Sequence, residues 1–121
     1  LRREDDGMFV LLIRHRKGGH RSFPKGHVER GESERRTAER EVLEETGIAV
    51  EDVRYFGAQP WGFSGSLLLG YTARLAGEDR ITVQESELAE ARWITRAEIP
   101  ESDPRVSLTA TMMEAFRLGK I

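Results

Sequence analysis

The chain has 121 residues, enough for one hydrophobic core and too few for two, so a single domain over residues 1–121 is predicted. Hydrophobic residues make up 38% of the chain and charged residues 33%, and no apolar run approaches the ~18 residues of a membrane-spanning helix. The formal net charge is −2, and the absence of cysteine excludes a disulfide framework, a thiolate zinc site and a thiol nucleophile. These properties are typical of a cytoplasmic protein that is not associated with a membrane. Because the sequence starts at Leu1 rather than at methionine, we expect an incomplete N-terminus.

The first third of the chain predicts two short strands joined by a hairpin. Residues 1–3 fit the end of a strand, and residues 4–7 contain Asp-Gly, the strongest short turn signal. Residues 8–13 form a nearly continuous apolar run, which is typical of a strand buried on both faces. A Lys-Gly-Gly loop at 17–19 follows. Residues 23–28 are expected to be extended, because a residue before proline is pushed out of the helical region.

One helix is predicted with both of its ends marked. Ser33 is a favourable N-cap residue, and Gly47 is a natural left-handed stop, so the helix should end at about Thr46.

The remainder of the chain alternates between apolar strands and a final helix. Strands are expected at 48–56, 67–75 and 91–95, with a loop rich in proline and glycine at 59–66. Residues 106–118 carry apolar side chains at helical spacing and predict a closing amphipathic helix. Helices interleaved with strands indicate an α/β sandwich around a mixed sheet.

Charge is unevenly distributed along the chain. Between Arg14 and His27 every charged residue is basic, whereas acidic residues outnumber basic ones between Glu29 and Asp52. A basic segment beside an acidic one suits the binding of a divalent cation together with a polyphosphate. Two ordinary solvated surfaces are an equal alternative from charge alone.

Three acidic residues of the predicted helix carry the strongest chemical signal. Glu41, Glu44 and Glu45 stand at positions i, i+3 and i+4, so their carboxylates should project from one face about a turn apart. Repulsion among these three negative charges weakens the helix unless a cation lies between them. Carboxylate oxygens are suitable ligands for Mg²⁺ or Mn²⁺. Arg40 should point to a different side of the helix and pair with Glu32.

The segment 26–48 resembles the signature of the Nudix hydrolase family at every fixed position. The matching residues are Gly26, Glu32, Arg40, Glu41, Val42, Glu44, Glu45, Gly47 and Ile48. The resemblance implies a Nudix-type α/β/α sandwich with a central mixed β-sheet, and a loop–helix–loop that binds metal. An acidic solvated helix with a glycine stop is the alternative, but it explains neither Gly26 nor Arg40 in register.

The resemblance also implies roles for individual residues. Glu41 and Glu45 would be the main metal ligands, with Glu44 as a further ligand, and the main-chain carbonyl of Lys25 would also coordinate. Glu32 and Arg40 would form an orienting salt bridge. One more acidic ligand is expected from outside the signature; we favour Glu87, with Glu85 or an ordinary solvated carboxylate as alternatives.

The predicted reaction is attack of water on phosphorus in a phosphoanhydride. The metal would neutralise charge on the non-bridging oxygens and lower the pKa of its bound water, and Glu41 or Glu44 would accept the proton. Arg14 and Arg21 are candidates for holding the phosphates.

A loop downstream of the signature predicts the substrate. The sequence Gln-Pro-Trp-Gly-Phe-Ser-Gly-Ser at 59–66 resembles the NADH pyrophosphatase branch of the family, which implies cleavage of an NADH- or NAD-type dinucleotide into AMP and a mononucleotide. Trp61 and Phe63 would stack on a base, and Gln59 and Ser66 would hydrogen-bond to it. Capping of the core by both aromatic rings is the alternative.

Other functions stay open at this point. Pro-Lys-Gly-His at 24–27 resembles diadenosine polyphosphate hydrolases instead. A catalytically inactive nucleotide sensor and a nucleic-acid-binding module are further hypotheses. An RNA with a dinucleotide cap would be a ligand consistent with both the enzymatic and the nucleic-acid-binding hypotheses. A homodimer is also left open.

Overall fold

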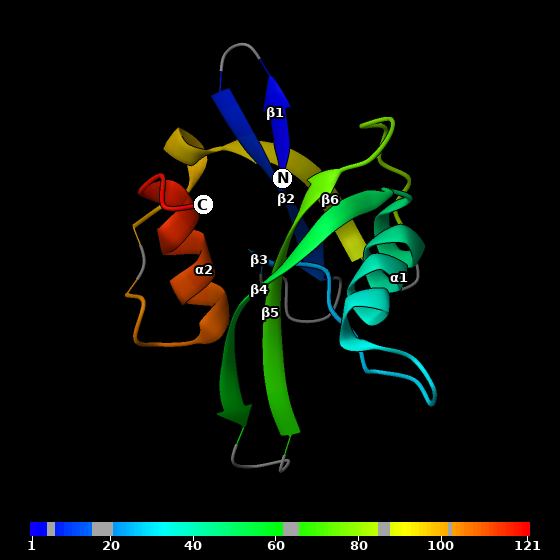
Figure 1. Ribbon diagram of the computed structural model, residues 1–121. Helices are drawn as coiled ribbons and strands as arrows, with labels where there is room; N and C mark the ends of the chain where they lie inside the picture. The colour runs from blue at the N-terminus through cyan, green and yellow to red at the C-terminus, as the bar shows by residue number, and fades with distance from the viewer. Residues whose placement is uncertain (5–6, 16–20, 62–65, 85–87, 102) are drawn as a thin grey trace.

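A computed structural model describes residues 1–4, 7–15, 21–61, 66–84, 88–101 and 103–121 (Figure 1). The elements in chain order are β1 (Arg2–Glu4), β2 (Gly7–His15), β3 (Arg21–Ser22), α1 (Glu34–Thr46), β4 (Val50–Trp61), β5 (Ser66–Leu75), β6 (Leu88–Thr95), the 3₁₀ turn η1 (Arg96–Glu98) and α2 (Leu108–Arg117).

The first sheet is built around β2. This strand pairs with β1, β3 and β6, and all three pairings are antiparallel. The residues of β2 from Val10 to Ile13 are all buried, so both faces of the strand are covered, as the continuous apolar run predicts. Strand β2 is thus the central strand of this sheet.

The second sheet is a long hairpin of β4 and β5, whose lower end extends beyond the rest of the molecule (Figure 1). The prediction of a strand at 48–56 and a loop at 59–66 was wrong in its bounds, because β4 continues to Trp61 and β5 begins at Ser66. Pro60 is accommodated opposite Leu67 since each strand of a two-stranded sheet is an edge strand, where a missing N–H does not break a ladder.

Helix α1 has the predicted ends, whereas α2 is shorter than predicted. The Ser33 hydroxyl accepts a hydrogen bond from the Arg36 N–H at 3.2 Å, and Gly47 ends α1 in the left-handed conformation with φ 72°. Helix α2 begins two residues later than predicted, after Ser107, whose hydroxyl accepts from the Ala110 N–H. Neither helix is long and apolar enough to cross a membrane.

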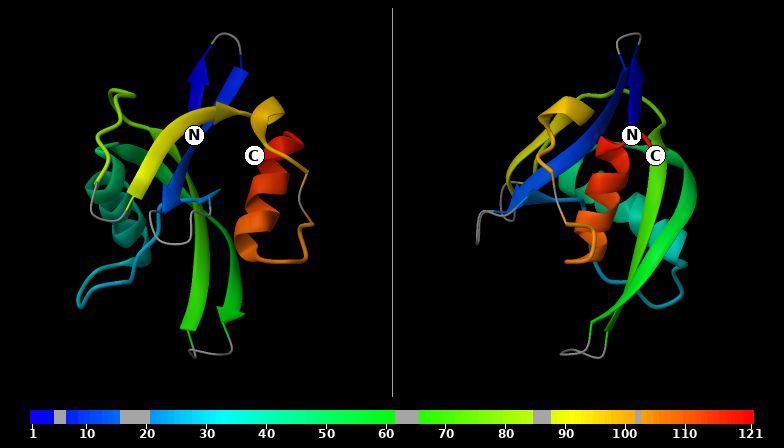
Figure 2. Two further views of the ribbon diagram at one scale, coloured as in Figure 1. Left: turned by 180° about the vertical axis from the view of Figure 1, so that it is seen from behind. Right: turned by 90° about the vertical axis from the view of Figure 1, so that its left-hand side faces the viewer.

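Strands lie between α1 and α2, which are on opposite sides of the molecule in Figure 1 and in the left-hand view of Figure 2. The main core joins the first sheet to α2 through five buried residues, Val10, Leu12, Ile94, Ile99 and Phe116. Helix α1 packs against β4 and β5. The predicted α/β sandwich is confirmed. In place of one mixed sheet, the described pairings form two antiparallel sheets. Few residues separate β1 from β2, β2 from β3 and β4 from β5 along the chain, and such short separations suit antiparallel pairing.

Candidate functional site

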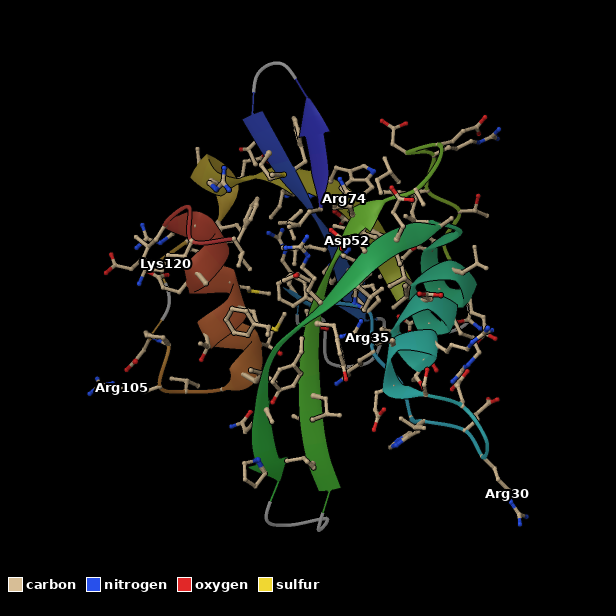
Figure 3. All side chains as sticks on the ribbon, in the orientation of Figure 1. Arg30, Arg35, Asp52, Arg74, Arg105 and Lys120 are labelled. Carbon is tan, nitrogen blue, oxygen red and sulfur yellow. The ribbon has the colours of Figure 1, made fainter. Side chains whose placement is uncertain are left out.

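The site is organised around the segment that leads from β3 into α1. At its far end Arg30 points away from the molecule into solvent (Figure 3), whereas Gly26 lies directly against the helix. A Cβ atom on Gly26 would stand 2.0 Å from Cδ and Oε1 of Glu41. Only glycine therefore lets the carboxylate of Glu41, whose side chain is 16% exposed, lie on the backbone of this segment.

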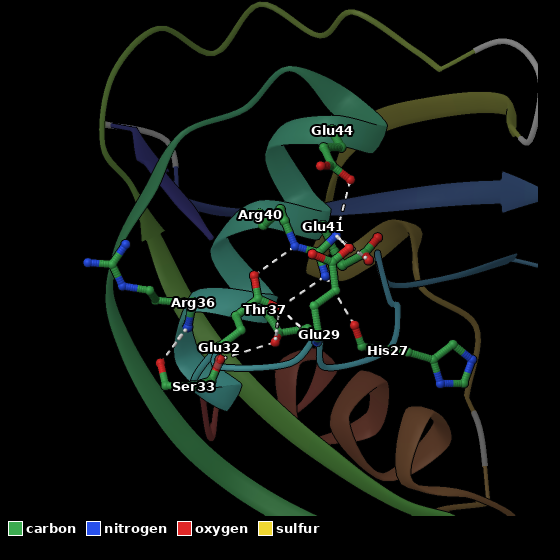
Figure 4. A network of polar contacts seen from close by, with 9 residues as sticks. All are labelled: His27, Glu29, Glu32, Ser33, Arg36, Thr37, Arg40, Glu41 and Glu44. Carbon is green, nitrogen blue, oxygen red and sulfur yellow. Dashed lines mark hydrogen bonds and ion pairs between the residues drawn. The ribbon is translucent and has the colours of Figure 1, made fainter.

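Arg40 fastens the same segment to the helix. Its Nε donates to Oε2 of Glu32 at 2.8 Å, and its Nη2 donates to Oε1 of Glu32 at 3.1 Å and to the His27 carbonyl at 3.0 Å (Figure 4). Such bidentate pairing fixes orientation as well as separation. The structure thus contains the Glu32–Arg40 pair that the spacing predicts.

The Glu32 carboxylate has further donors. The Thr37 hydroxyl donates to Oε1 at 2.6 Å, and the Glu29 N–H donates to the same oxygen at 3.2 Å. The hydrogen bonds from Arg40 and Thr37 lower the pKa of Glu32 to about 2, and the hydrogen bond to Glu32 raises the pKa of Arg40. Both groups are therefore charged at neutral pH.

Arg40 also contacts two of the predicted metal ligands. Its Nη1 donates to Oε1 of Glu41 at 2.9 Å and to Oε2 of Glu44 at 3.2 Å. The expectation that Arg40 points away from these acids was wrong, because its long guanidinium side chain presents donors on several sides and Glu44 lies one turn along the helix. Figure 4 shows all of these groups gathered on one side of α1.

This arrangement provides a test of whether a divalent cation fits. Oxygen atoms of Glu41 and Glu44 converge on one cationic nitrogen, so both carboxylates reach a shared position, and hard oxygen donors are those that Mg²⁺ and Mn²⁺ prefer. Across the described residues, no three acidic, histidine or cysteine side chains are already arranged around one metal position. The donor chemistry fits a divalent ion, with two carboxylates as the starting set.

The third predicted acid of the helix lies in different surroundings. Glu45 is 4% exposed, whereas the side chain of Glu44 is 56% exposed. The main-chain carbonyl of Glu45 accepts a hydrogen bond from the Gln84 N–H at 2.9 Å, which ties the end of α1 to the segment before β6.

Two predicted phosphate-binding residues lie side by side on the first sheet. Arg14 and Arg21 are directly opposite one another on β2 and β3. Arg14 Nη2 also forms a salt bridge of 3.3 Å with Glu90 of β6. Lys25 is exposed beside Gly26.

The predicted substrate loop is described only in part. Gln59 is held by α2, because its Oε1 accepts a hydrogen bond from the Leu108 N–H at 2.9 Å. Trp61 and Ser66 are opposite one another at the ends of β4 and β5. Phe63 and Glu87 lie outside the described residues.

Sequence reasoning missed three contributors to the site. The Thr37 hydroxyl, the Glu29 N–H and the His27 carbonyl complete the network around Glu32 and Arg40. Thr37 lies four residues after the N-cap, where a hydroxyl reaches back to the preceding turn, and this spacing was the available signal.

Comparisons with known proteins agree with the geometry. The family model described as NUDIX domain matches residues 1–116. The chain is 41% identical over 111 residues to the NAD-capped RNA hydrolase NudC of Pasteurella multocida, covering 89% of this chain and 42% of the relative. It is 42% identical over 118 residues to the NudC of Mannheimia succiniciproducens, covering 90% of this chain and 43% of the relative. The chain thus spans less than half the length of these relatives.

Solved structures show the same fold. A NUDIX hydrolase from Nitrosomonas europaea superposes with a TM-score of 0.70 at 27% identity, covering 99% of this chain and 86% of that one. A C. elegans Ap4A hydrolase superposes with a TM-score of 0.66 at 22% identity, covering 93% of this chain and 84% of that one. The chain belongs to the NUDIX family, and the assignment to the Nudix hydrolases made from the spacing within residues 26–48 is confirmed.

Proposed function

We propose that this chain hydrolyses a phosphoanhydride bond in a derivative of a nucleoside diphosphate, with the help of Mg²⁺ or Mn²⁺. One observation carries the proposal: the Glu41 and Glu44 carboxylates converge on the same nitrogen, Nη1 of Arg40. The Glu41 carboxylate also lies against the backbone of Gly26, where a residue with a Cβ atom would clash with it. Oxygen donors suit a hard dication, which would supply charge neutralisation to a phosphate.

From the sequence we expected Glu41 and Glu45 to be the main ligands, but we now propose Glu41 and Glu44, because these two carboxylates reach one position whereas Glu45 is buried. Further ligands would be Glu45, the Lys25 carbonyl and, from outside the signature, Glu87. A bound dication supplies charge neutralisation at the non-bridging oxygens and activates water. Arg40 and Glu32 are positioning residues, because they hold the segment that carries Lys25 and Gly26 against α1. The exposed Glu44 carboxylate can accept a proton from water, whereas Glu41 is packed on Gly26, so we assign the base to Glu44.

For the substrate we propose an NADH- or NAD-type dinucleotide, free or as the cap of an RNA, with AMP as one product. Relatives about 40% identical are named NAD-capped RNA hydrolases, which supports this choice. Because Leu108 occupies Oε1 of Gln59, the amide NH₂ is the group that Gln59 would offer to a base. Trp61 and Phe63 would stack on that base, Ser66 would hydrogen-bond to it, and Arg14 and Arg21 would hold phosphate.

A diadenosine polyphosphate hydrolase is the second candidate. It is supported by the Pro-Lys-Gly-His sequence at 24–27, a segment that is tied to the site since the His27 carbonyl accepts from Arg40. An inactive nucleotide sensor is the alternative from another class.

A substrate panel separates these functions. NADH, NAD, ADP-ribose and diadenosine tetraphosphate are incubated with the chain in Mg²⁺ and in Mn²⁺, and the products are identified by chromatography. We expect NADH to have the highest kcat/KM, with release of AMP and loss of turnover in Glu41→Gln. A tenfold preference for diadenosine tetraphosphate would establish the second candidate. Nucleotide binding without turnover in either metal would establish the sensor.

A further inference from the structure

An arginine-rich row crosses the first sheet on one face. The register places Arg21 of β3 opposite Arg14 of β2, and Arg14 opposite Glu90 of β6. Residues directly opposite in a sheet share a face, as do residues two apart on one strand, so Arg92 joins the same face beside Glu90. Together with Leu12 and Ile13, these four charged residues line one depression.

The charges in this row do not balance. Glu90 is shared by two arginines, with salt bridges of 3.3 Å to Arg14 Nη2 and 3.3 Å to Arg92 Nε. Arg21 is exposed and forms no salt bridge with a carboxylate of the described residues. Within the row, three guanidinium groups and one carboxylate leave two net positive charges, and Glu98 of η1 interacts electrostatically with Arg92 from outside the row.

Placing two arginines directly opposite one another has a cost, because like charges across a strand pair destabilise a sheet. An anion bound between Arg14 and Arg21 would remove this repulsion. The side chains of Arg14 and Arg92 are 43% and 49% exposed, so their guanidinium groups are open to a ligand from solvent. Arginine also suits phosphate oxygens through paired N–H donors.

The row is on a different sheet from the one that supports the acidic helix. Helix α1 packs on β4 and β5, whereas the row lies on β3, β2 and β6. The two regions are connected by a short path, since Lys25 is the fourth residue after Arg21 and extended chain spans at most about 14 Å over four residues. One substrate with several phosphates is long enough to touch both.

We propose that Arg92 joins Arg14 and Arg21 in a site for a phosphate group of the substrate other than the diphosphate that is cleaved, so that Arg14 and Arg21 hold this additional phosphate and not the cleaved one. Glu90 limits the affinity of the site. The inference rests on the proposed function for the nature of the substrate. The additional phosphate has two sources, the first phosphodiester of an RNA attached to the dinucleotide or the extra phosphates of a dinucleoside polyphosphate. Arg92 is the residue of this site that the sequence did not indicate.

Two substitutions, one that removes a positive charge and one that removes a negative charge, should change RNA affinity in opposite directions and so test the proposal. Binding of a fluorescein-labelled single-stranded RNA with a 5′-phosphate is measured by anisotropy in EDTA at several salt concentrations. Arg92→Gln should weaken binding roughly two- to fivefold, as expected for one exposed ion pair, and should reduce the slope of log affinity against log salt by about 0.7. Glu90→Gln should instead tighten binding by a similar factor. Arg105→Gln, which removes an exposed arginine from the loop before α2 (Figure 3), should change neither value.

Comparison of kcat/KM between substrates identifies the source of the additional phosphate. The ratio of kcat/KM for NAD-capped RNA to that for NAD should fall in Arg92→Gln if the site takes the RNA chain, and the ratio for diadenosine tetraphosphate to NAD should fall if it takes extra anhydride phosphates. The proposal is overturned if neither ratio moves, or if Glu90→Gln weakens binding as Arg92→Gln does, since a purely structural role predicts losses in both. If no nucleotide is hydrolysed, but Arg92→Gln weakens RNA binding and Glu90→Gln tightens it, the proposed function is wrong and the proposed phosphate site is supported.

Discussion

Gly26→Ala places a methyl group where the Glu41 carboxylate already lies. The new Cβ would stand 2.0 Å from Cδ of Glu41, whereas ordinary van der Waals contact begins at 3.4 Å. The carboxylate must therefore move by about 1.4 Å, the difference between these separations. Because the displaced atoms are the far end of a flexible side chain, the helix can stay in place. The change should thus affect the metal site far more than the fold.

The expected magnitudes follow from that displacement. Misplacement of a reacting group by ~1 Å costs roughly 100-fold in rate, so we expect kcat/KM in Mg²⁺ to fall by about this factor. The free energy of unfolding, measured with urea, should change by no more than about 1 kcal/mol. If the alanine acts through Glu41, the double variant with Glu41→Gln should be no slower than the slower single variant.

Two other glycines provide matched controls. Gly77→Ala meets no atom within 4 Å and requires no positive φ, so neither rate nor stability should change. Gly31→Ala also meets no atom, but its φ of 80° should cost about 1 kcal/mol of stability while kcat/KM is kept. The reasoning is refuted if Gly26→Ala keeps full kcat/KM, or if its loss of activity is matched by unfolding.

Three further predictions concern stability. Folding lowers the pKa of Glu32 from 4.5 to about 2 through its bond to Arg40, so the stabilisation is complete above pH 4.5 and is lost as the pH falls toward 2. The difference in unfolding free energy between the unchanged chain and Glu32→Gln should shrink over that pH range in urea titrations. Gln59→Leu removes the acceptor for the Leu108 N–H and should lower the unfolding free energy by about 1 kcal/mol, seen as a lower urea midpoint. Gly47→Ala, at φ 72°, should lower the thermal midpoint through a loss of about 1 kcal/mol.

Elements with a strong local signal were predicted well. Helix α1 has a side-chain cap at Ser33 and a left-handed glycine at its end, and each acts within a few residues of the chain. Strand β2 was equally clear, because a run of apolar residues that is too short for a helix suits a strand buried on both faces.

The hairpin of β4 and β5 was only partly predictable. Proline and glycine at 59–66 are ordinary loop signals, yet Pro60 lies inside a strand. Whether a proline is tolerated depends on how many neighbours the strand has, and that is a property of the whole sheet. Local sequence alone carries no information on it.

The contacts of the candidate site were also predicted only in part. Glu32 and Arg40 were paired correctly, because one family spacing contains both residues. The contacts of Arg40 with Glu41 and Glu44 were missed, since the choice among nearby carboxylates depends on side-chain conformation rather than on spacing.

The row of Arg14, Arg21 and Arg92 shows why long-range sites are the hardest to predict. Arg92 is separated from the other two by most of the chain, and it shares their face only because of the register between β2 and β6. A slip of one residue in that register would turn Arg92 and Glu90 to the other face and leave the two arginines of β2 and β3 without a carboxylate beside them. The register depends in turn on burial, because Ile94, which lies opposite Val10, must face the core against α2. The same packing that stabilises the sheet therefore assembles the proposed phosphate site, at positions where the sequence shows only scattered basic residues.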